Sequence, residues 1–195
     1  MAVQLGDKAI GDIVKIKIAG QAREFIVVQK GKPSSIYPDS FNDGVILMMK
    51  NACGQHAWDT NNGIIYSNST IHAWLNNEFL SLIDDDIRNQ IIQVKIPYCI
   101  GNNMTDWQEN GLAAYVYILS RREVTSASFT GYPADGYPLS YFAGEGTGAS
   151  VKRTATFVDG SACVWWLRTP SGLYNTTILA RIFHRKGIDA ARNIL

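Results

Sequence analysis

Charged side chains are scarce in this sequence. Asp, Glu, Lys and Arg make up 18% of its 195 residues, whereas about 25% is usual for a globular protein. The formal net charge is only +1, so the chain as a whole has no strong attraction for nucleic acid or for an anionic membrane. We therefore expect no nucleic-acid partner.

Long apolar runs and paired cysteines are also missing. No apolar run approaches the roughly 20 residues that span a bilayer, and the first residues lack the cationic start and apolar stretch of a secretory signal. The cysteines, Cys53, Cys99 and Cys163, are far apart and odd in number, so no disulfide framework is implied. We expect a protein made in a cytoplasm, with no membrane insertion and with reduced cysteines.

Motifs of catalysis and of metal binding are absent too. His56, His72 and His184 are dispersed, and no Cys-x-x-Cys or His-x-x-x-His spacing occurs. Neither a Gly-x-Ser-x-Gly elbow nor a P-loop is present, and the run 144–148 imitates only part of a dinucleotide fingerprint. We expect no metal, no cofactor and no enzymatic activity.

Apolar and aromatic residues are plentiful by contrast. Hydrophobic residues make up 46% of the chain, which has five Trp, nine Tyr and seven Phe. This composition excludes a disordered chain and supplies a core for one domain of ordinary size. We expect a single domain over residues 1–195.

Periodicity predicts both strands and helices. The clearest helix runs from Ser69 to Phe79, with Ser69 as its N-cap and with Ile71, Trp74 and Leu75 on the inner face. A second short helix is expected over 84–92, where three Asp at the positive end of the helix dipole are favoured over a cation site. The expected strands are 12–18, 24–30, 45–50, 92–96, 115–120, 163–168, 177–182 and 188–195.

These elements indicate an α+β fold with mixed antiparallel sheets, because sheet and helix alternate without a βαβ rhythm. The apolar run 45–50 is typical of a strand buried on both faces. Glycine and aromatic residues crowd the stretch of about 125–160, so we expect a long surface loop there. Ordered loops on a scaffold often carry binding residues.

Charge is divided along the chain. Residues 1–150 hold 11 Lys and Arg against 15 Asp and Glu, a net of −4, and residues 151–195 hold 7 against 2, a net of +5. One interpretation is ordinary variation on a solvated surface. The other is a basic face that meets an acidic partner or a glycan.

Four segments resemble an uncharacterised domain family of gut bacteria and their phages, which is distantly similar to C-type lectins and formylglycine-generating enzymes. They are Ser69-x-Ile-His-x-Trp-Leu-Asn-x-x-Phe79, Ile118-Leu-Ser-x-x-Glu123, Trp165-Trp-Leu-Arg-Thr-Pro170 and a closing Gly187-Ile. After the last, the family continues with Arg-Pro-Ala, whereas this chain has Asp189-Ala-Ala-Arg192. The resemblance implies a compact C-type-lectin-like fold and, in phages, receptor recognition through loops near the C-terminus.

The motif residues leave two structural questions open. Trp165 and Trp166 are adjacent on an expected strand and point to opposite faces, so either both are buried or one is an exposed stacking platform for a sugar. Arg168 either supports that platform or forms an ion pair with Glu123 or Asp159. Lectin calcium tripeptides and the reactive cysteine pair of formylglycine-generating enzymes are absent.

The functional hypothesis is a non-enzymatic recognition or structural module of a phage virion or phage-like particle, for receptor binding or for tail or capsid decoration. Its partners would be other virion or surface proteins, copies of itself in a homo-oligomer, and a cell-surface glycan or protein receptor. The alternative is a glycan-acting hydrolase on the same scaffold, with Glu123 or Asp159 as the acid. The candidate ligand-binding residues are Tyr137, Tyr141, Phe142, Trp166, Arg168, Tyr174, Asn175, Arg181 and Arg185.

Overall fold

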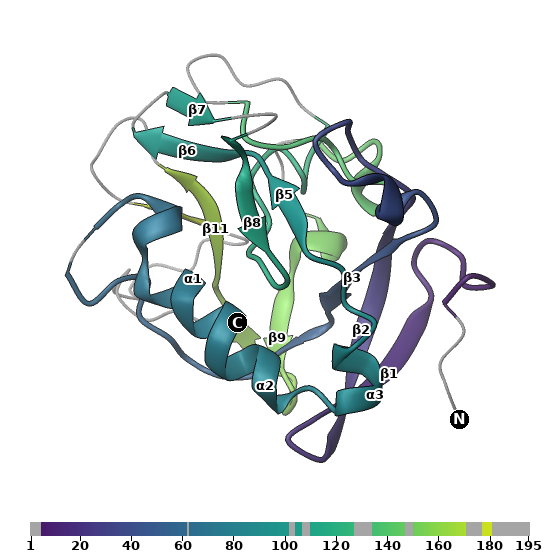
Figure 1. Cartoon of the computed structure of the whole chain (residues 1–195). Helices are drawn as coiled ribbons and strands as arrows, with labels where there is room; N and C mark the ends of the chain where they lie inside the picture. The colour runs from purple at the N-terminus through teal and green to yellow at the C-terminus, as the bar shows by residue number, and fades with distance from the viewer. Residues whose placement is uncertain are drawn as a thin grey trace.

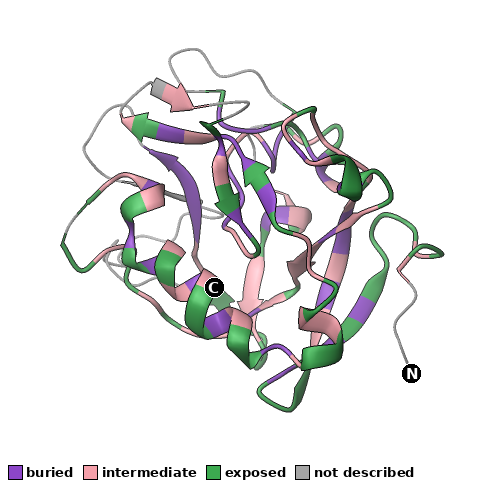
Figure 2. Cartoon of the chain, in the orientation of Figure 1, coloured by how far each residue is buried: buried purple, intermediate pink, exposed green. Residues whose placement is uncertain are grey.

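The predicted hairpin opens the chain in the computed structural model, which describes residues 5–61, 63–101, 104–106, 110–126, 134–146, 150–170 and 177–180. Strand β1 (Ile13–Ile18) pairs antiparallel with β2 (Gln21–Lys30). Ala19 and Gly20 join them with positive φ angles of 50° and 75°, as a two-residue hairpin turn requires. Val14, Ile16 and Ile18 of β1 are buried, whereas Lys15, Lys17 and the first residue, Ile13, are exposed (Figure 2). This alternation confirms the period-two interpretation.

Strand β3 (Val45–Met49) extends this hairpin to a three-stranded antiparallel sheet in the order β1-β2-β3 (Figure 1). The strand confirms the prediction for residues 45–50, but the prediction that both faces are buried is wrong. Only Ile46 is buried, and Val45, Leu47, Met48 and Met49 are half-buried. Among the described residues β3 pairs with β2 alone.

The remaining elements are short. They are β4 (Asn51–Ala52), α1 (Thr70–Trp74), a π-helical stretch (Leu75–Phe79), α2 (Leu80–Leu82), α3 (Asp85–Arg88), β5 (Val94–Ile96), β6 (Tyr98–Gly101), β7 (Met104–Asp106), β8 (Leu112–Ala114), β9 (Ala155–Phe157), β10 (Ala162–Cys163), β11 (Trp165–Pro170), β12 (Thr177–Ala180), and 3-10 helices at Asp39–Phe41, Tyr66–Asn68, Ser140–Phe142 and Val151–Arg153. Strand β9 pairs antiparallel with β10 and parallel with β4, and the pairs β5–β8, β6–β7 and β11–β12 are antiparallel. The chain is an α+β protein with mostly antiparallel sheets.

The predicted helix over 69–79 is present and continues to Leu82. Ser69 caps it, because its Oγ accepts a hydrogen bond from the His72 N–H at 3.3 Å. Ile71, Leu75 and Phe79 are buried on its inner face, whereas Trp74 is half-buried. The second helix is shorter than predicted, since α3 covers only Asp85–Arg88. Within the described residues, no helix is both long and apolar enough to cross a bilayer.

Residues 115–120 are not the strand that their apolar run predicts. The Asn76 side chain occupies the backbone of this segment: Oδ1 accepts from the N–H groups of Tyr115 and Val116 at 2.8 and 3.2 Å, and Nδ2 donates to the Val116 carbonyl at 2.9 Å. These bonds replace a strand ladder and attach the π-helical stretch to the chain after β8. Asn76 thus satisfies backbone groups of a segment that lies about 40 residues later in the chain.

The glycine-rich stretch of 125–160 is not a purely surface loop in its described part. Leu139 and Phe142 are fully buried, since apolar side chains of this size are driven out of water. The Leu139 N–H donates to the Glu123 carbonyl at 3.1 Å, so the segment returns to the turn that contains Glu123. The last predicted strand, 188–195, lies outside the described residues.

Candidate functional site

The nine predicted binding residues do not form one accessible surface. Tyr137 is 42% exposed and Tyr141 is half-buried. Phe142, Trp166 and Arg168 are buried, at 0%, 7% and 0% exposure, so these three side chains do not contribute to an accessible surface in this structure. Tyr174, Asn175, Arg181 and Arg185 lie outside the described residues.

Arg168 is the centre of a buried polar cluster on β11. Its guanidinium donates to both carboxylate oxygens of Glu123, at 2.7 Å from Nη1 and 2.6 Å from Nη2. It also donates to three backbone carbonyls, those of Pro97, Ile118 and Asp135, at 2.8 to 3.0 Å. Burial alone lowers the pKa of Arg168, but the adjacent Glu123 carboxylate outweighs this and holds that pKa above its ordinary value. The guanidinium therefore stays charged and joins three distant segments of the chain.

The turn at residues 120–124 presents Glu123 to Arg168. The Ser120 N–H donates to Glu123 Oε2 at 2.8 Å, and the Ser120 hydroxyl accepts from the Glu123 N–H at 3.2 Å. Glu123 itself is 2% exposed. Of the two open partners for Arg168, the structure thus selects Glu123 over Asp159. A carboxylate occupied on both oxygens and closed to solvent is poorly placed to protonate a glycosidic oxygen.

Asp159, the other candidate acid, is exposed in the turn between β9 and β10. Its Oδ1 accepts from the Ser161 hydroxyl at 2.6 Å and from the Ser161 N–H at 2.9 Å. These hydrogen bonds lower the pKa of Asp159, whereas a general acid needs a raised pKa. The Asp159 carboxylate therefore stabilises the turn between β9 and β10.

Asp135 and Thr169 extend the buried cluster. The Thr169 hydroxyl donates to Asp135 Oδ2 at 2.7 Å, and the Cys99 thiol donates to the same oxygen at 3.6 Å. Burial raises the pKa of Asp135. Sequence reasoning missed Asp135, whose only signal is its place in a glycine-rich stretch far from the motifs that it contacts.

Neither tryptophan of the Trp165–Trp166 pair is an exposed platform. Trp166 packs against Trp58, with ring centroids 5.5 Å apart, and its Nε1 donates to the His56 carbonyl at 3.3 Å. Trp165 is half-buried and its Nε1 donates to the Arg153 carbonyl at 3.3 Å. Both indole N–H groups are therefore used by the fold, as buried tryptophans usually require.

Among the described residues of the predicted site, the accessible aromatic ones are Tyr137 and Tyr141. Their segment is held to β2, because the backbone N–H and the hydroxyl of Ser140 both donate to Gln29 Oε1, at 2.9 and 2.8 Å. Lys152 lies 5.2 Å from the centre of the Tyr141 ring and donates to the Tyr141 carbonyl at 2.7 Å. The Tyr141 ring therefore lies beside a lysine ammonium, an arrangement typical of a cation–π contact.

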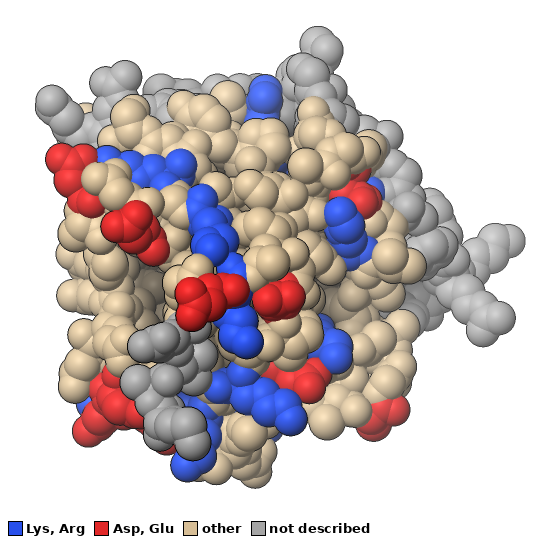
Figure 3. Space-filling view, turned by 90° about the vertical axis from the view of Figure 1, so that its right-hand side faces the viewer, with Lys and Arg blue, Asp and Glu red and all other residues tan. Residues whose placement is uncertain are grey.

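A basic face is not evident in the described part of the C-terminal segment. Arg153 and Arg168 are buried, and Lys152 is engaged with Tyr141 and lies 3.7 Å from Glu145. The face over β1 to β3 shows Lys, Arg, Asp and Glu intermixed among uncharged residues (Figure 3). The other basic residues of the segment, including Arg181 and Arg185, lie outside the described residues.

Metal-ligating residues do not gather anywhere in the described ranges: no group of three or more His, Cys, Asp or Glu side chains occurs there. The three successive acidic residues open α3, where the Asp84 carbonyl accepts from Arg88 N at 2.9 Å and Asp85 pairs with the Arg88 side chain at 2.5 Å. This placement fits the helix-dipole interpretation.

Comparison with protein-family models matches residues 42–193 to a domain of unknown function, DUF6273. The match covers most of the chain and includes the helix motif, the Glu123 turn and the Trp165–Pro170 strand. Comparisons with curated proteins and with solved structures found no match.

Proposed function

The chain belongs to the DUF6273 family, and from that premise we propose that it is a non-enzymatic recognition or structural module on a C-type-lectin-like scaffold. We place it in a phage virion or phage-like particle, for receptor binding or for tail or capsid decoration. The α+β architecture and the helix and Trp-Trp-Leu-Arg motifs support the lectin-like assignment. Its partners would be neighbouring particle proteins, further copies of the chain, and a surface glycan or protein receptor.

The observation that carries this proposal is that Glu123 is buried and ion-paired with Arg168. The carboxylate that a hydrolase would use as its acid is bound on both oxygens by a fully buried arginine. Its role in the described structure is to join the 120–124 turn to β11. The motifs that contain Glu123 and Arg168 therefore stabilise the core of the protein. We infer that binding takes place on the surface around this core.

The contact surface that we propose centres on Tyr137 and Tyr141 beside Lys152. Tyrosines are favourable contact residues because they bring a large, rigid area at low entropic cost. Phe142 lies beneath Tyr141, with ring centroids 5.1 Å apart, and so supports the surface. Tyr174, Asn175, Arg181 and Arg185 remain part of the proposal as residues of the segment that follows β11.

A particle assay with a matched tyrosine pair tests this proposal. Particles sedimented from a lysate of the producing cells should contain the chain. Particles that carry the Tyr137→Ala variant should adsorb to host cells about tenfold more weakly than particles with the natural chain. Tyr115→Ala is the control, because Tyr115 is 41% exposed against 42% for Tyr137 but sits beside the helix at Asn76.

Three outcomes separate the alternatives. A chain found only among slowly sedimenting soluble proteins would overturn the particle assignment. Adsorption unchanged by Tyr137→Ala, with the chain still in the particle, would favour decoration over receptor binding. Turnover of a cell-wall or capsular polysaccharide by the purified chain would favour the hydrolase.

A further inference from the structure

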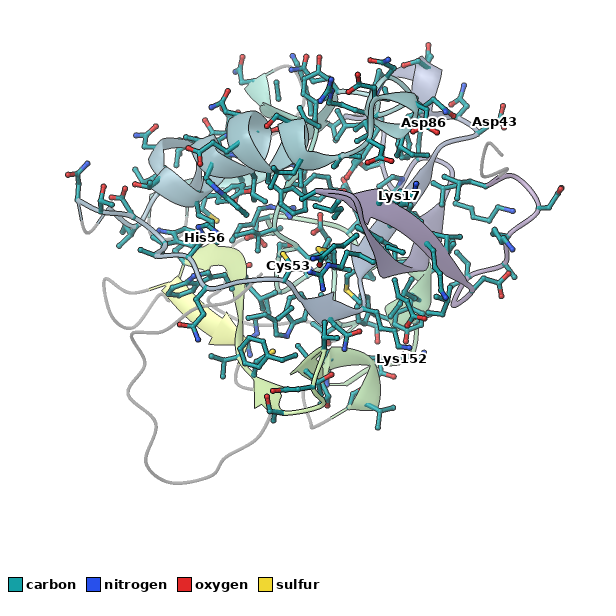
Figure 4. The ribbon with its side chains drawn as sticks, turned by 90° about the horizontal axis from the view of Figure 1, so that it is seen from below. Lys17, Asp43, Cys53, His56, Asp86 and Lys152 are labelled. Carbon is teal, nitrogen blue, oxygen red and sulfur yellow. The ribbon has the colours of Figure 1, made fainter. Side chains whose placement is uncertain are left out.

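Asp135 is a fully buried carboxyl group, at 0% exposure, in the polar cluster around Arg168. Asp43 and Asp86, by contrast, are exposed to solvent, and Figure 4 shows Asp43 at the outer edge of the molecule. Moving a carboxylate out of water costs far more than moving the neutral acid, unless a cation or strong hydrogen-bond donors compensate. The partners of Asp135 therefore decide in which form the folded chain holds it.

The Arg168 guanidinium has no N–H group left for the Asp135 carboxyl. A guanidinium has five N–H groups. Nε donates to the Pro97 carbonyl, and Nη1 donates to the Ile118 carbonyl and to Glu123 Oε2. Nη2 donates to Glu123 Oε1 and to the backbone carbonyl of Asp135. All five groups are thus used, and the charge of the guanidinium is balanced by the bidentate Glu123 carboxylate.

The donors that do reach the Asp135 carboxyl are uncharged and act on one oxygen. They come from β11 and β6, two strands that lie side by side (Figure 1). The Thr169 hydroxyl donates to Oδ2 at 2.7 Å, and the Cys99 thiol, a weak donor, lies 3.6 Å from the same oxygen. Oδ1 is buried and has no hydrogen-bond partner in the described part of the chain.

The charges around Asp135 add up to zero without it. In the described structure, Arg168 contributes one positive charge and Glu123 one negative charge. The other titratable groups around the cluster are neutral, because burial raises their pKa; they are Cys99, Tyr37 and Tyr117. Burial raises the pKa of Asp135 as well, and Glu123 adds to this, although Arg168 acts in the opposite sense. An ionised Asp135 would leave the cluster with a buried negative charge that nothing balances.

We propose that the folded chain holds Asp135 as a neutral carboxylic acid, and that loss of its proton to solvent loosens the attachment of residues 134–142 to β11. The proton belongs on Oδ1, because Oδ2 already accepts from two donors. Ionisation would place a second negative charge near Glu123, where Arg168 holds the Asp135 main chain at 2.8 Å. A change of binding through Tyr137 with pH rests on the proposed function, whereas this proton switch does not.

NMR of the full chain, labelled with ¹³C at the aspartate carboxyl carbons, tests the protonation directly. The Asp135 resonance, assigned by its absence from Asp135→Asn, should titrate above the ordinary aspartate value of about 3.9. Glu123→Gln should move this titration to lower pH, because it removes the neighbouring negative charge. A midpoint at or below about 3.9 in the natural chain would overturn the proposal, whatever the variants do.

Urea unfolding as a function of pH measures the effect on stability. A carboxyl group whose pKa is raised by folding adds stability that is complete below the unfolded pKa and is lost as the pH rises through the folded pKa. Above about pH 4 the natural chain should therefore lose stability relative to Asp135→Asn, by up to about tenfold in the folding equilibrium constant per pH unit. Because the two chains are compared at each pH, the contributions of other groups cancel.

Asp159→Asn is the matched control. The hydrogen bonds from Ser161 lower the pKa of the exposed Asp159, so its titration lies on the acid side of this range. The pH dependence of Asp159→Asn above about pH 4 should be that of the natural chain. A stability difference between the natural chain and Asp135→Asn that stays constant, or that shifts in favour of the natural chain as the pH rises, would contradict the proposal.

Hydrogen–deuterium exchange locates the loosening. The amides of Leu139 and Phe142 donate to the carbonyls of Glu123 and Leu139. With rising pH, these amides should lose protection faster than those of β2 in the natural chain, and in step with those of β2 in Asp135→Asn. Equal loss of protection in both segments of the natural chain would refute the loosening of residues 134–142.

Discussion

The Glu123–Arg168 ion pair allows the sharpest test of whether the family motifs serve the core or chemistry. The perturbation is Glu123→Gln, which keeps the shape of the side chain and removes its charge. Arg168 is 0% exposed and Glu123 is 2% exposed, so the guanidinium would remain buried without a counter-charge. Removing one partner of a buried pair costs about 3 to 5 kcal/mol.

The assay is urea unfolding and thermal melting, followed by tryptophan fluorescence and circular dichroism. A loss of this size corresponds to a fall of about 6 to 20 °C in melting temperature for a chain of this length. The control is Glu24→Gln, which makes the same chemical change in the Glu24–Lys50 pair. That pair has an N···O distance of 2.7 Å and side chains that are 36% and 46% exposed, so its loss should cost less than about 1 kcal/mol.

The reasoning would be refuted if Glu123→Gln destabilised the protein no more than Glu24→Gln does. A catalytic acid predicts another pattern, in which Glu123→Gln abolishes turnover of a polysaccharide while the melting temperature stays near that of the natural chain. The two roles of Glu123 are thus separated by one variant and two measurements.

Three further predictions concern residues that position this core. Asn76→Ala should lower the free energy of unfolding in urea by about 2 to 4 kcal/mol, because it leaves the backbone groups of Tyr115 and Val116 without their partners. The control is Asn77→Ala. The exposed Asn77 side chain donates only to the Ala73 carbonyl, so this variant should change stability by less than about 0.5 kcal/mol. Gly136→Ala should destabilise by about 1 to 3 kcal/mol, since a Cβ there would meet Ser120 Oγ and lie 2.8 Å from Glu123 Cγ, whereas Gly146→Ala, with open space around its Cβ, should be tolerated. Burial lowers the pKa of His72, so the unfolded state binds more protons and stability should fall as pH drops from about 7 through the ordinary histidine range. His72→Gln should flatten part of that slope in melting curves recorded from pH 7 to 5.5, and an unchanged slope would contradict this assignment.

Local patterns predicted the elements in which near neighbours decide the structure. The period-two alternation of residues 12–18 and the Ser69 cap before an apolar face both appear as expected. The same reasoning failed at 115–120, where an apolar run has no strand ladder because Asn76, 39 residues earlier, binds its backbone. No local pattern carries information about such a partner.

In the candidate site, too, local patterns identified residues, but only contacts between distant segments determined their partners. Resemblance identified Glu123 and Arg168 as motif residues and left the partner of Arg168 open. Only the fold brings the two together across 45 residues of chain and places Asp135 beside them. It also buries Phe142 and Trp166, which were candidate ligand-binding residues on the grounds of the glycine-rich loop, its aromatic residues and the motif resemblance.

By itself, the sequence determined that this is an α+β protein with a hairpin start, a capped amphipathic helix and an aromatic-rich core. Those properties depend on the spacing of side chains along a few turns or one strand. The tertiary structure decided which polar groups are buried in pairs and which aromatic residues stay accessible. These depend on contacts between segments that are far apart in the chain, where packing and desolvation rather than local periodicity select the partner.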